Sequence, residues 1–324
     1  MFIDMVPGAN RANLLQTLNA ISSDAQNLRN RGTSDGSGPS QRVAEYVAWA
    51  NRAVSMLTYQ VSPRDIDRLI LTRRYELLLG AGELHSKAIL NLLYAELDSR
   101  VRILDDLISD LQRQTERWPD DGERFVAMDT GVFLHGDKIE ELDLQQILHG
   151  TLEPIRLLIP MVVIDELDRL KEKNDVHIRW RAGYTLAVLD RIVADPRRPA
   201  RLFAAGFSGE GDNRIPRGEV TVEIILDRPG HVRLPSDDDE LIDRLASIQP
   251  LAQRQVTLIT YDTGMRHRAI SKDLKVIKLD VDLGPEPPPP GQSTRAKRRE
   301  RMAMQNQVRQ QHAIEHGDTS AVTQ

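Results

Sequence analysis

The sequence predicts an α/β domain with a mostly parallel sheet, preceded by an all-α region and followed by a disordered tail. From about Arg124, short apolar runs alternate with helical patterns, which is typical of parallel strands joined by helices that cover the sheet. Residues 1–117, by contrast, are rich in Ala, Leu and Arg and hold almost no strand pattern. Residues 285–324 contain a proline run followed by a basic cluster and a Gln-rich stretch, a composition that favours an extended, solvated chain.

Composition limits the class of protein. The chain has 324 residues with 40% hydrophobic content, enough for one large or two ordinary domains. It has no early apolar segment and no apolar run of 18 residues, so we expect no signal peptide, no membrane span and a cytoplasmic location. The lack of cysteine excludes disulfides, thiolate metal sites and cysteine nucleophiles. The net charge of −5 argues against a generally basic nucleic-acid binder, although local charge matters more than the total.

The first third of the chain is predicted to be helical. We expect an N-terminal helical segment over residues 1–30, a flexible Gly/Ser loop over residues 31–40 and a helical domain over residues 41–120. The loop prediction depends on its dense Gly, Ser and Asp content, which favours neither helix nor strand.

Two helix signals stand out in this region. Ser62 is a suitable N-cap, and Pro63 then occupies the first helical position, so a helix is expected to begin there. Further on, seven apolar residues from Leu90 to Leu111 are spaced by three or four, which predicts one long helix with an apolar stripe. The stripe suits a bundle within the chain or an oligomerising coiled coil, and its irregular spacing at 97–101 favours the bundle.

The α/β domain is predicted over residues 124–284. Its strands are expected at Phe125–Met128, Arg156–Ile159, Val256–Thr260 and Leu274–Leu279, and its helices at Asp143–His149, Val162–Lys173, Arg179–Val193, Asp238–Ile248 and Thr263–Ser271. One segment departs from the alternation, because Glu219–Leu226 and His231–Leu234 flank a Pro-Gly turn as the strands of a β-hairpin would.

Acidic residues follow several of these apolar runs. Asp129, Glu166, Asp239 and Asp262 each lie at or just beyond one. Because the carboxyl ends of parallel strands share one edge of the sheet, acids far apart in sequence converge there, where ligands bind. Convergent carboxylates are the ligands that Mg²⁺ and Mn²⁺ prefer. Asp239 is our assignment for the third acid of this set, and three neighbouring acids are alternatives to it: Asp237, Asp238 and Asp243.

These motifs, taken in order, resemble the PIN-domain family. The phrase from Ile159-Pro160 to Glu166-Leu-Asp-Arg-Leu-Lys171 is similar to the branch in which a strand ends in Ile-Pro and the next helix carries Glu-Leu-Asp-x-Leu-Lys. Asp129-Thr130 before it and Thr260-Tyr-Asp262 after it stand in the family's order. The resemblance covers about half the chain and implies a three-layer PIN-like domain.

The resemblance also implies roles for these residues. Asp129, Glu166, Asp239 and Asp262 would be the catalytic acids and the ligands of one or two Mg²⁺ or Mn²⁺ ions, with Asp129 shared between the ions. Thr260 would support them by donating a hydrogen bond that orients a carboxylate or a metal-bound water.

Four arginines lie close to these acids in the sequence. They are ordinary surface charges by default, but they follow Glu166 or Asp262 closely enough to flank a cleft and contact phosphates: Arg179, Arg181, Arg266 and Arg268.

The function implied is metal-dependent hydrolysis of phosphodiester bonds, most directly as an endoribonuclease acting on single-stranded RNA. The serious alternative is a catalytically silent PIN-like module that binds RNA or a protein. A phosphotransferase of the haloacid-dehalogenase type needs a second Asp two residues after Asp129, where this chain has Gly131. In a PIN-like nuclease, the N-terminal helices would position substrate, form a homo-oligomer, or bind a protein inhibitor as in toxin–antitoxin pairs.

Overall fold

The computed structural model describes residues 3–31, 38–80, 87–119, 122–150, 152–208, 215–227, 230–280 and 302. Contacts divide the chain into two units, Met1–Leu279 and Asp280–Gln324. The elements below all lie in the first unit. The predicted tail over residues 285–324 lies outside the described residues, apart from Met302, and so do residues 32–37 of the predicted loop.

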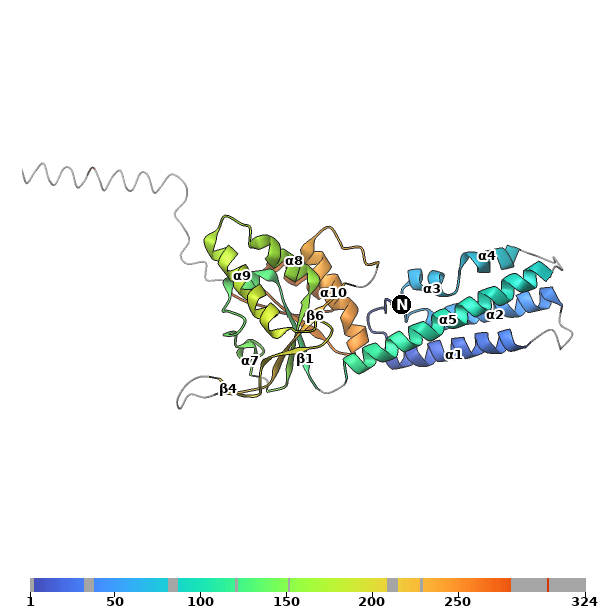
Figure 1. Ribbon diagram of the computed structural model, residues 1–324, viewed down its shortest axis with the longest axis horizontal. Helices are drawn as coiled ribbons and strands as arrows, with labels where there is room; N and C mark the ends of the chain where they lie inside the picture. Colours follow the sequence, from blue (N-terminus) through green and yellow to red (C-terminus); the bar gives the residue numbers. More distant parts are fainter. Residues whose placement is uncertain are drawn as a thin grey trace, which may run out of the picture. The chain divides into compact units, whose positions relative to one another are not determined.

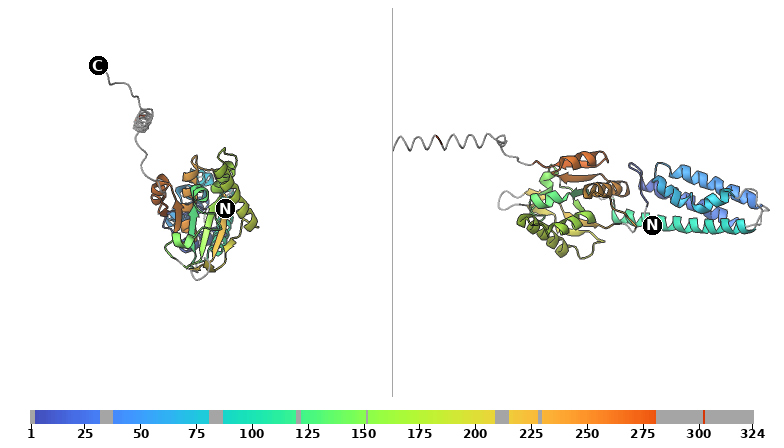
Figure 2. Two further views of the ribbon diagram at one scale, coloured as in Figure 1. Left: turned by 90° about the vertical axis from the view of Figure 1, so that its left-hand side faces the viewer. Right: turned by 90° about the horizontal axis from the view of Figure 1, so that it is seen from above.

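The N-terminal part is a helical bundle. Its helices are α1 (Arg11–Asn30), α2 (Pro39–Leu57), α3 (Pro63–Leu69), α4 (Arg73–Gly80) and α5 (Lys87–Arg117). Figures 1 and 2 show α1, α2 and α5 side by side. The predicted long helix is confirmed as α5, and Leu93, Leu97 and Leu104 of its stripe are buried inside the bundle. The predicted start at Pro63 is also confirmed, because the Ser62 hydroxyl caps α3 at the Asp65 N–H.

The C-terminal half of the unit is a mixed, mostly parallel sheet flanked by helices (Figures 1 and 2), which confirms the predicted fold class. The strand order is β3-β6-β2-β1-β7-β8, and only β3 runs antiparallel to its neighbour. The strands are β1 (Arg124–Met128), β2 (Ile155–Pro160), β3 (Ala200–Phe203), β6 (Val220–Ile225), β7 (Val256–Thr260) and β8 (Lys275–Lys278). The helices are α6 (Thr130–His135), α7 (Leu144–Ile147), α8 (Met161–Leu170), α9 (Val176–Ile192), α10 (Asp237–Ala252) and α11 (Thr263–Ile270).

The hairpin prediction is wrong. Val220–Ile225 is β6, a strand inside the sheet that pairs in parallel with β2, while its antiparallel neighbour is β3. His231–Leu234 forms no strand, and Val232 is 84% exposed. The apolar character of β6 reflects burial in the sheet, since Val220, Val222 and the residues after it are buried. The sequence also gave no sign of β3, or of the short ribbon of β4 (Gly206–Ser208) and β5 (Ile215–Arg217), because these segments are only three or four residues long.

A buried ionic cluster fastens the helical bundle to the sheet. Glu223, in the middle of β6, is fully buried. Its carboxylate accepts a hydrogen bond from the Trp118 indole N–H at 3.1 Å and pairs with Arg156 at 3.2 Å. It also pairs with Arg117, the last residue of α5. From α1, the buried Arg11 guanidinium donates to the carbonyl oxygen of Trp118 at 2.9 Å, so both long helices are tied to this corner of the α/β half.

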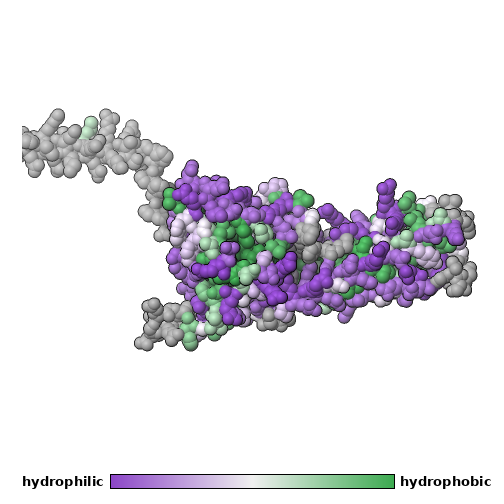
Figure 3. Space-filling view, in the orientation of Figure 1, coloured by the Kyte–Doolittle hydropathy of each residue, from purple (hydrophilic) through white to green (hydrophobic). Residues whose placement is uncertain are grey.

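The surface in Figure 3 is mixed. Hydrophilic residues prevail along the helical half, and a group of hydrophobic residues gathers over the α/β half, near the positions that Figure 1 labels α8, α9 and β6. Among the described residues, no helix combines the length and the apolar character that a membrane crossing requires.

Candidate functional site

A pocket of about 190 Å³ lies where several strands end and the following helices begin. β1 leads into α6, β2 into α8 and β7 into α11, so the parallel sheet brings three helix starts to one edge. The start of α10 completes the ring. The pocket is lined by Asp129, Thr130, Gly131, Val162, Val163, Glu166, Asp237, Asp238, Leu241, Asp262 and Met265.

Asp129 is the most enclosed of the acids, with 6% of its surface exposed. It is the N-cap of α6, where its Oδ1 accepts from the Val132 N–H at 2.9 Å. The Thr260 hydroxyl donates to its Oδ2, which is the supporting bond that the sequence predicts. Burial raises the pKa of Asp129 above its ordinary value, and the charges of Asp238 and Asp262 act in the same direction, against the two hydrogen bonds.

Asp262 and Asp129 make the same local contact, because each caps the helix that follows it. Asp262 is the N-cap of α11, and its Oδ1 accepts from the Met265 N–H at 2.6 Å. The backbone N–H of Asp262 donates to the Thr260 hydroxyl oxygen at 2.9 Å, so one hydroxyl connects the two acidic positions. Each acid is followed by Thr-Gly. A Cβ atom at Gly131 would lie 3.3 Å from Asp129 Oδ1, and one at Gly264 would lie 3.1 Å from Asp262 Oδ1.

Glu166 enters the pocket from α8. Its Oε2 accepts from the Thr130 hydroxyl at 2.5 Å, which joins α8 to the start of α6. Thr130 is a further site residue, and the sequence predicted no role of its own for it. Its position directly after Asp129 is the signal that it lies near the site.

The start of α10 offers three candidates for the third acid, and the role of Asp239 as a metal ligand stays a prediction. Asp239 does not line the pocket, whereas Asp237 and Asp238 do. The Asp238 carboxylate pairs with Arg268 at 2.6 Å, and Asp239 contacts the same guanidinium at 3.2 Å. Because successive residues of a helix point about 100° apart, a shift of one position turns the carboxylate away from the pocket. Asp243, another rival, is also absent from the lining.

Neighbouring charges also affect the acids at the start of α10. Burial raises the pKa of Asp238 above its ordinary value; the charges of Asp262 and Asp239 raise it further, and Arg268 opposes them. Asp237 is paired with Arg169 of α8. Asp238 is therefore the acid of α10 that shares the electrostatic environment of Asp129 and Asp262.

The four predicted arginines separate into three cases. Arg181 is buried, and its guanidinium donates to the carbonyl oxygens of residues 133, 136 and 137, so it fixes the end of α6 and the prediction of a phosphate contact is wrong. Arg268 is partly exposed and is engaged by the acids of α10. Arg179 and Arg266 are exposed and lie outside the pocket lining, so their contact with phosphate stays a prediction.

The donor set suits a hard divalent cation. Asp129, Glu166, Asp238 and Asp262 offer carboxylate oxygens, and among the described residues Arg268 is the cation that pairs with one of them. Burial raises the pKa values of Asp129 and Asp238, and the negative charges of neighbouring acids raise them further. Mg²⁺ and Mn²⁺ bind such oxygen ligands and would offset those negative charges.

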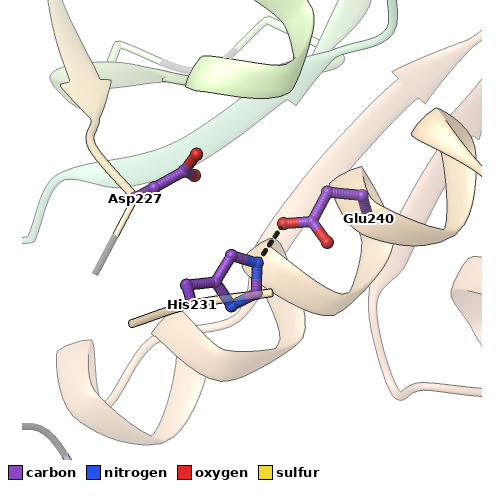
Figure 4. Close-up of side chains that lie close together, drawn as sticks. All are labelled: Asp227, His231 and Glu240. Atoms are coloured by element: carbon purple, nitrogen blue, oxygen red, sulfur yellow. Dashed lines mark hydrogen bonds and ion pairs between the residues drawn. The ribbon is translucent and has the colours of Figure 1, made fainter. Parts of the chain in front are cut away.

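A second group near α10 carries metal-binding residue types but is already engaged (Figure 4). Ligand atoms of Asp227, His231 and Glu240 lie within 4.8 Å of one another. The Glu240 carboxylate contacts His231 Nε2 at 2.6 Å and accepts from the Leu234 N–H at 2.9 Å, while Asp227 pairs with Arg233 at 2.6 Å. These contacts hold the segment before α10 against the helix, and the group lies outside the acidic pocket.

Comparison with known proteins agrees with this geometry. The chain matches no curated protein. The family model of the PIN domain matches residues 126–280, the part that contains the sheet and the acidic pocket. Over these residues the chain therefore carries a PIN domain.

Proposed function

We propose that this protein is a Mg²⁺- or Mn²⁺-dependent nuclease that cuts phosphodiester bonds within single-stranded RNA. The observation that supports the proposal is the convergence of Asp129, Glu166, Asp238 and Asp262 on one pocket at the carboxyl edge of the sheet. The PIN domain is in general a nuclease-type fold. RNA as substrate and internal cleavage rest on the family resemblance.

The four acids would hold one or two divalent ions. When bound, such ions lower the pKa of water and neutralise charge that develops on the phosphate and the leaving oxygen. The chain's own hydroxyls keep the acids in place: Thr260 holds the Asp129 carboxylate, and Thr130 holds that of Glu166. Among the described residues that line the pocket, there is no serine, cysteine or histidine, and the Thr130 hydroxyl is engaged by Glu166, so water is the nucleophile that we propose.

The direct test is cleavage of labelled single-stranded RNA by the full chain with Mg²⁺ or Mn²⁺. We expect shortened internal fragments with either metal and none with EDTA. A single-stranded DNA of the same sequence, run in parallel, reports the preference for RNA. Intact RNA at every metal concentration would contradict the proposal and favour the alternative, a catalytically silent module that binds RNA or a protein.

The position of the third acid gives a sharper prediction. Asp238→Asn is expected to lower the rate of RNA cleavage by about 10-fold or more, because even outer partners of a metal site cost about 10–100-fold when removed. Asp239→Asn, the matched control on the same helix turn, is expected to keep the rate within about 2-fold, since this side chain does not line the pocket. Equal losses in the two variants, or a larger loss in Asp239→Asn, would show that the assignment of Asp238 is wrong.

Metal binding is expected to depend on pH. The folded-state pKa values of Asp129 and Asp238 are raised, so their protonated forms stabilise the metal-free fold at low pH, and this stabilisation is lost as the pH rises through those values. Mg²⁺ binds the ionised forms, so its stabilising effect grows over the same range. Thermal unfolding should show a rise in Tm of about 4 °C with saturating Mg²⁺ near pH 7.5 and a much smaller rise near pH 4. An equal rise at both pH values would contradict this.

A further inference from the structure

A second and larger pocket, of about 540 Å³, lies between the helical bundle and the α/β half of the same unit. Arg64 and Arg68 of α3 line it from the bundle. Arg244 of α10 and Lys272, two residues after α11, line it from the α/β half. Basic side chains from both halves of the unit therefore meet at this pocket.

Arg244 is the most informative of these residues. It is only 5% exposed, and it donates to the Leu226 carbonyl oxygen at 3.1 Å. Its Nε has no hydrogen-bond partner, and among the described residues no carboxylate pairs with it. A buried guanidinium without a counter-ion is costly, and an anion in the pocket would supply both the charge and the acceptor that Arg244 lacks.

The neighbouring charges limit the size of that anion. Asp65 is paired with Arg68 at 2.6 Å, and Asp4 and Asp243 also line the pocket. Arg64 and Lys272 are exposed, and within the described residues neither has an ion pair. The balance of charge around the pocket is only slightly positive, which suits a single phosphate group.

The pocket is connected to the acidic site by two helices. α10 and α11 both begin at the acidic pocket, with Asp238 in the first turn of one and Asp262 as the N-cap of the other. Arg244, further along α10, and Lys272, two residues after the end of α11, line the second pocket. Asp238 and Arg244 are six residues apart on α10, which is a rise of about 9 Å along the helix and a turn of about 240° around it, so the two pockets open on different sides of α10.

We propose that this pocket holds a backbone phosphate of the RNA strand that is cut at the acidic site. The inference rests on the proposed function, and it gives the helical bundle a role, because α3 would contact the substrate together with the PIN domain. Contacts of this kind fix the register of a strand and are independent of its sequence.

The test measures the binding of a labelled RNA of about ten nucleotides to the full chain carrying Asp129→Asn, with Mg²⁺ and at several salt concentrations. Adding Arg64→Ala and Lys272→Ala is expected to raise Kd about 10-fold and to reduce the salt dependence of log Kd by about 1. Both residues are exposed, so the fold should survive their replacement. The matched control replaces Arg52 and Lys275, an exposed arginine and an exposed lysine outside the pocket lining, and should leave Kd unchanged.

Equal affinity for RNA in the double variant and its control would overturn the inference. Titration of the wild-type chain with inorganic phosphate separates the two sources of the anion. If free phosphate binds through Arg64 and Lys272 while RNA affinity does not depend on them, the pocket serves a small phosphorylated ligand and the strand proposal is wrong. If the wild-type chain binds RNA through this pocket but does not cleave it, the proposed function is wrong and the phosphate-binding role of the pocket stands.

Discussion

Replacing Asp129 by asparagine is expected to reduce metal-dependent cleavage of RNA by about 100-fold or more. Asp129 is the most buried acid of the pocket, and it contacts Thr260 and the start of α6 at once. Asparagine keeps the size and the N-cap preference of aspartate but removes the charge that a divalent ion needs. The loss should therefore appear in cleavage and in metal binding, with the fold intact.

Asp143→Asn is a matched control for this change. Asp143 is the N-cap of α7 and accepts from the Gln146 N–H at 3.0 Å, so it makes the same local contact away from the pocket. Its replacement should leave cleavage unchanged. Rates for Asp129→Asn within about 2-fold of the wild type, at equal Tm, would remove Asp129 from the site.

Glu223→Ala is expected to lower the free energy of unfolding by about 3–5 kcal/mol. Glu223 is fully buried and pairs with both Arg117 and Arg156. Without it, Arg156 keeps its pair with Glu123 at 2.5 Å, whereas Arg117 loses its carboxylate partner. Glu223 also accepts from Trp118, so the end of α5 would lose its anchor on the sheet. Urea unfolding followed by circular dichroism measures the change.

Glu219→Ala, four residues earlier and just before β6, is the control for Glu223→Ala. Glu219 is partly exposed and pairs with Arg201 on the surface, so its loss should cost less than about 1 kcal/mol. A loss below about 1 kcal/mol for Glu223→Ala as well would show that the buried cluster adds little to stability.

Much of the fold follows from local patterns. β1, β2 and β7 are buried except for the partly buried Arg124, and their apolar residues predicted them. β6 was misread because an apolar, β-branched run indicates a strand without naming its partner, and its partner β2 lies about 60 residues earlier in the chain. The short strands β3, β4 and β5 have too few residues to show a period.

The site was predictable in its residue types and less so in its geometry. Asp129 and Asp262 have no other acid beside them, and Glu166 was chosen over its neighbours Asp165 and Asp168 through the family resemblance. The structure brings Asp129, Glu166 and Asp262 to one pocket. In the run from Asp237 to Asp239, by contrast, the choice depends on the rotation of a helix whose first residue the sequence does not fix. Arg181 shows the same limit, because its spacing from Glu166 could not reveal that it turns inward to backbone carbonyls.

The Thr-Gly pairs that follow Asp129 and Asp262 bear on whether a related chain that keeps the acids is catalytically active. A larger residue at Gly131 or Gly264 would press its Cβ against the carboxylate oxygen that caps the helix. A relative that retains every acid could therefore be inactive through crowding alone. The presence of all four carboxylates therefore predicts activity in a relative only when the two glycines beside them are present as well.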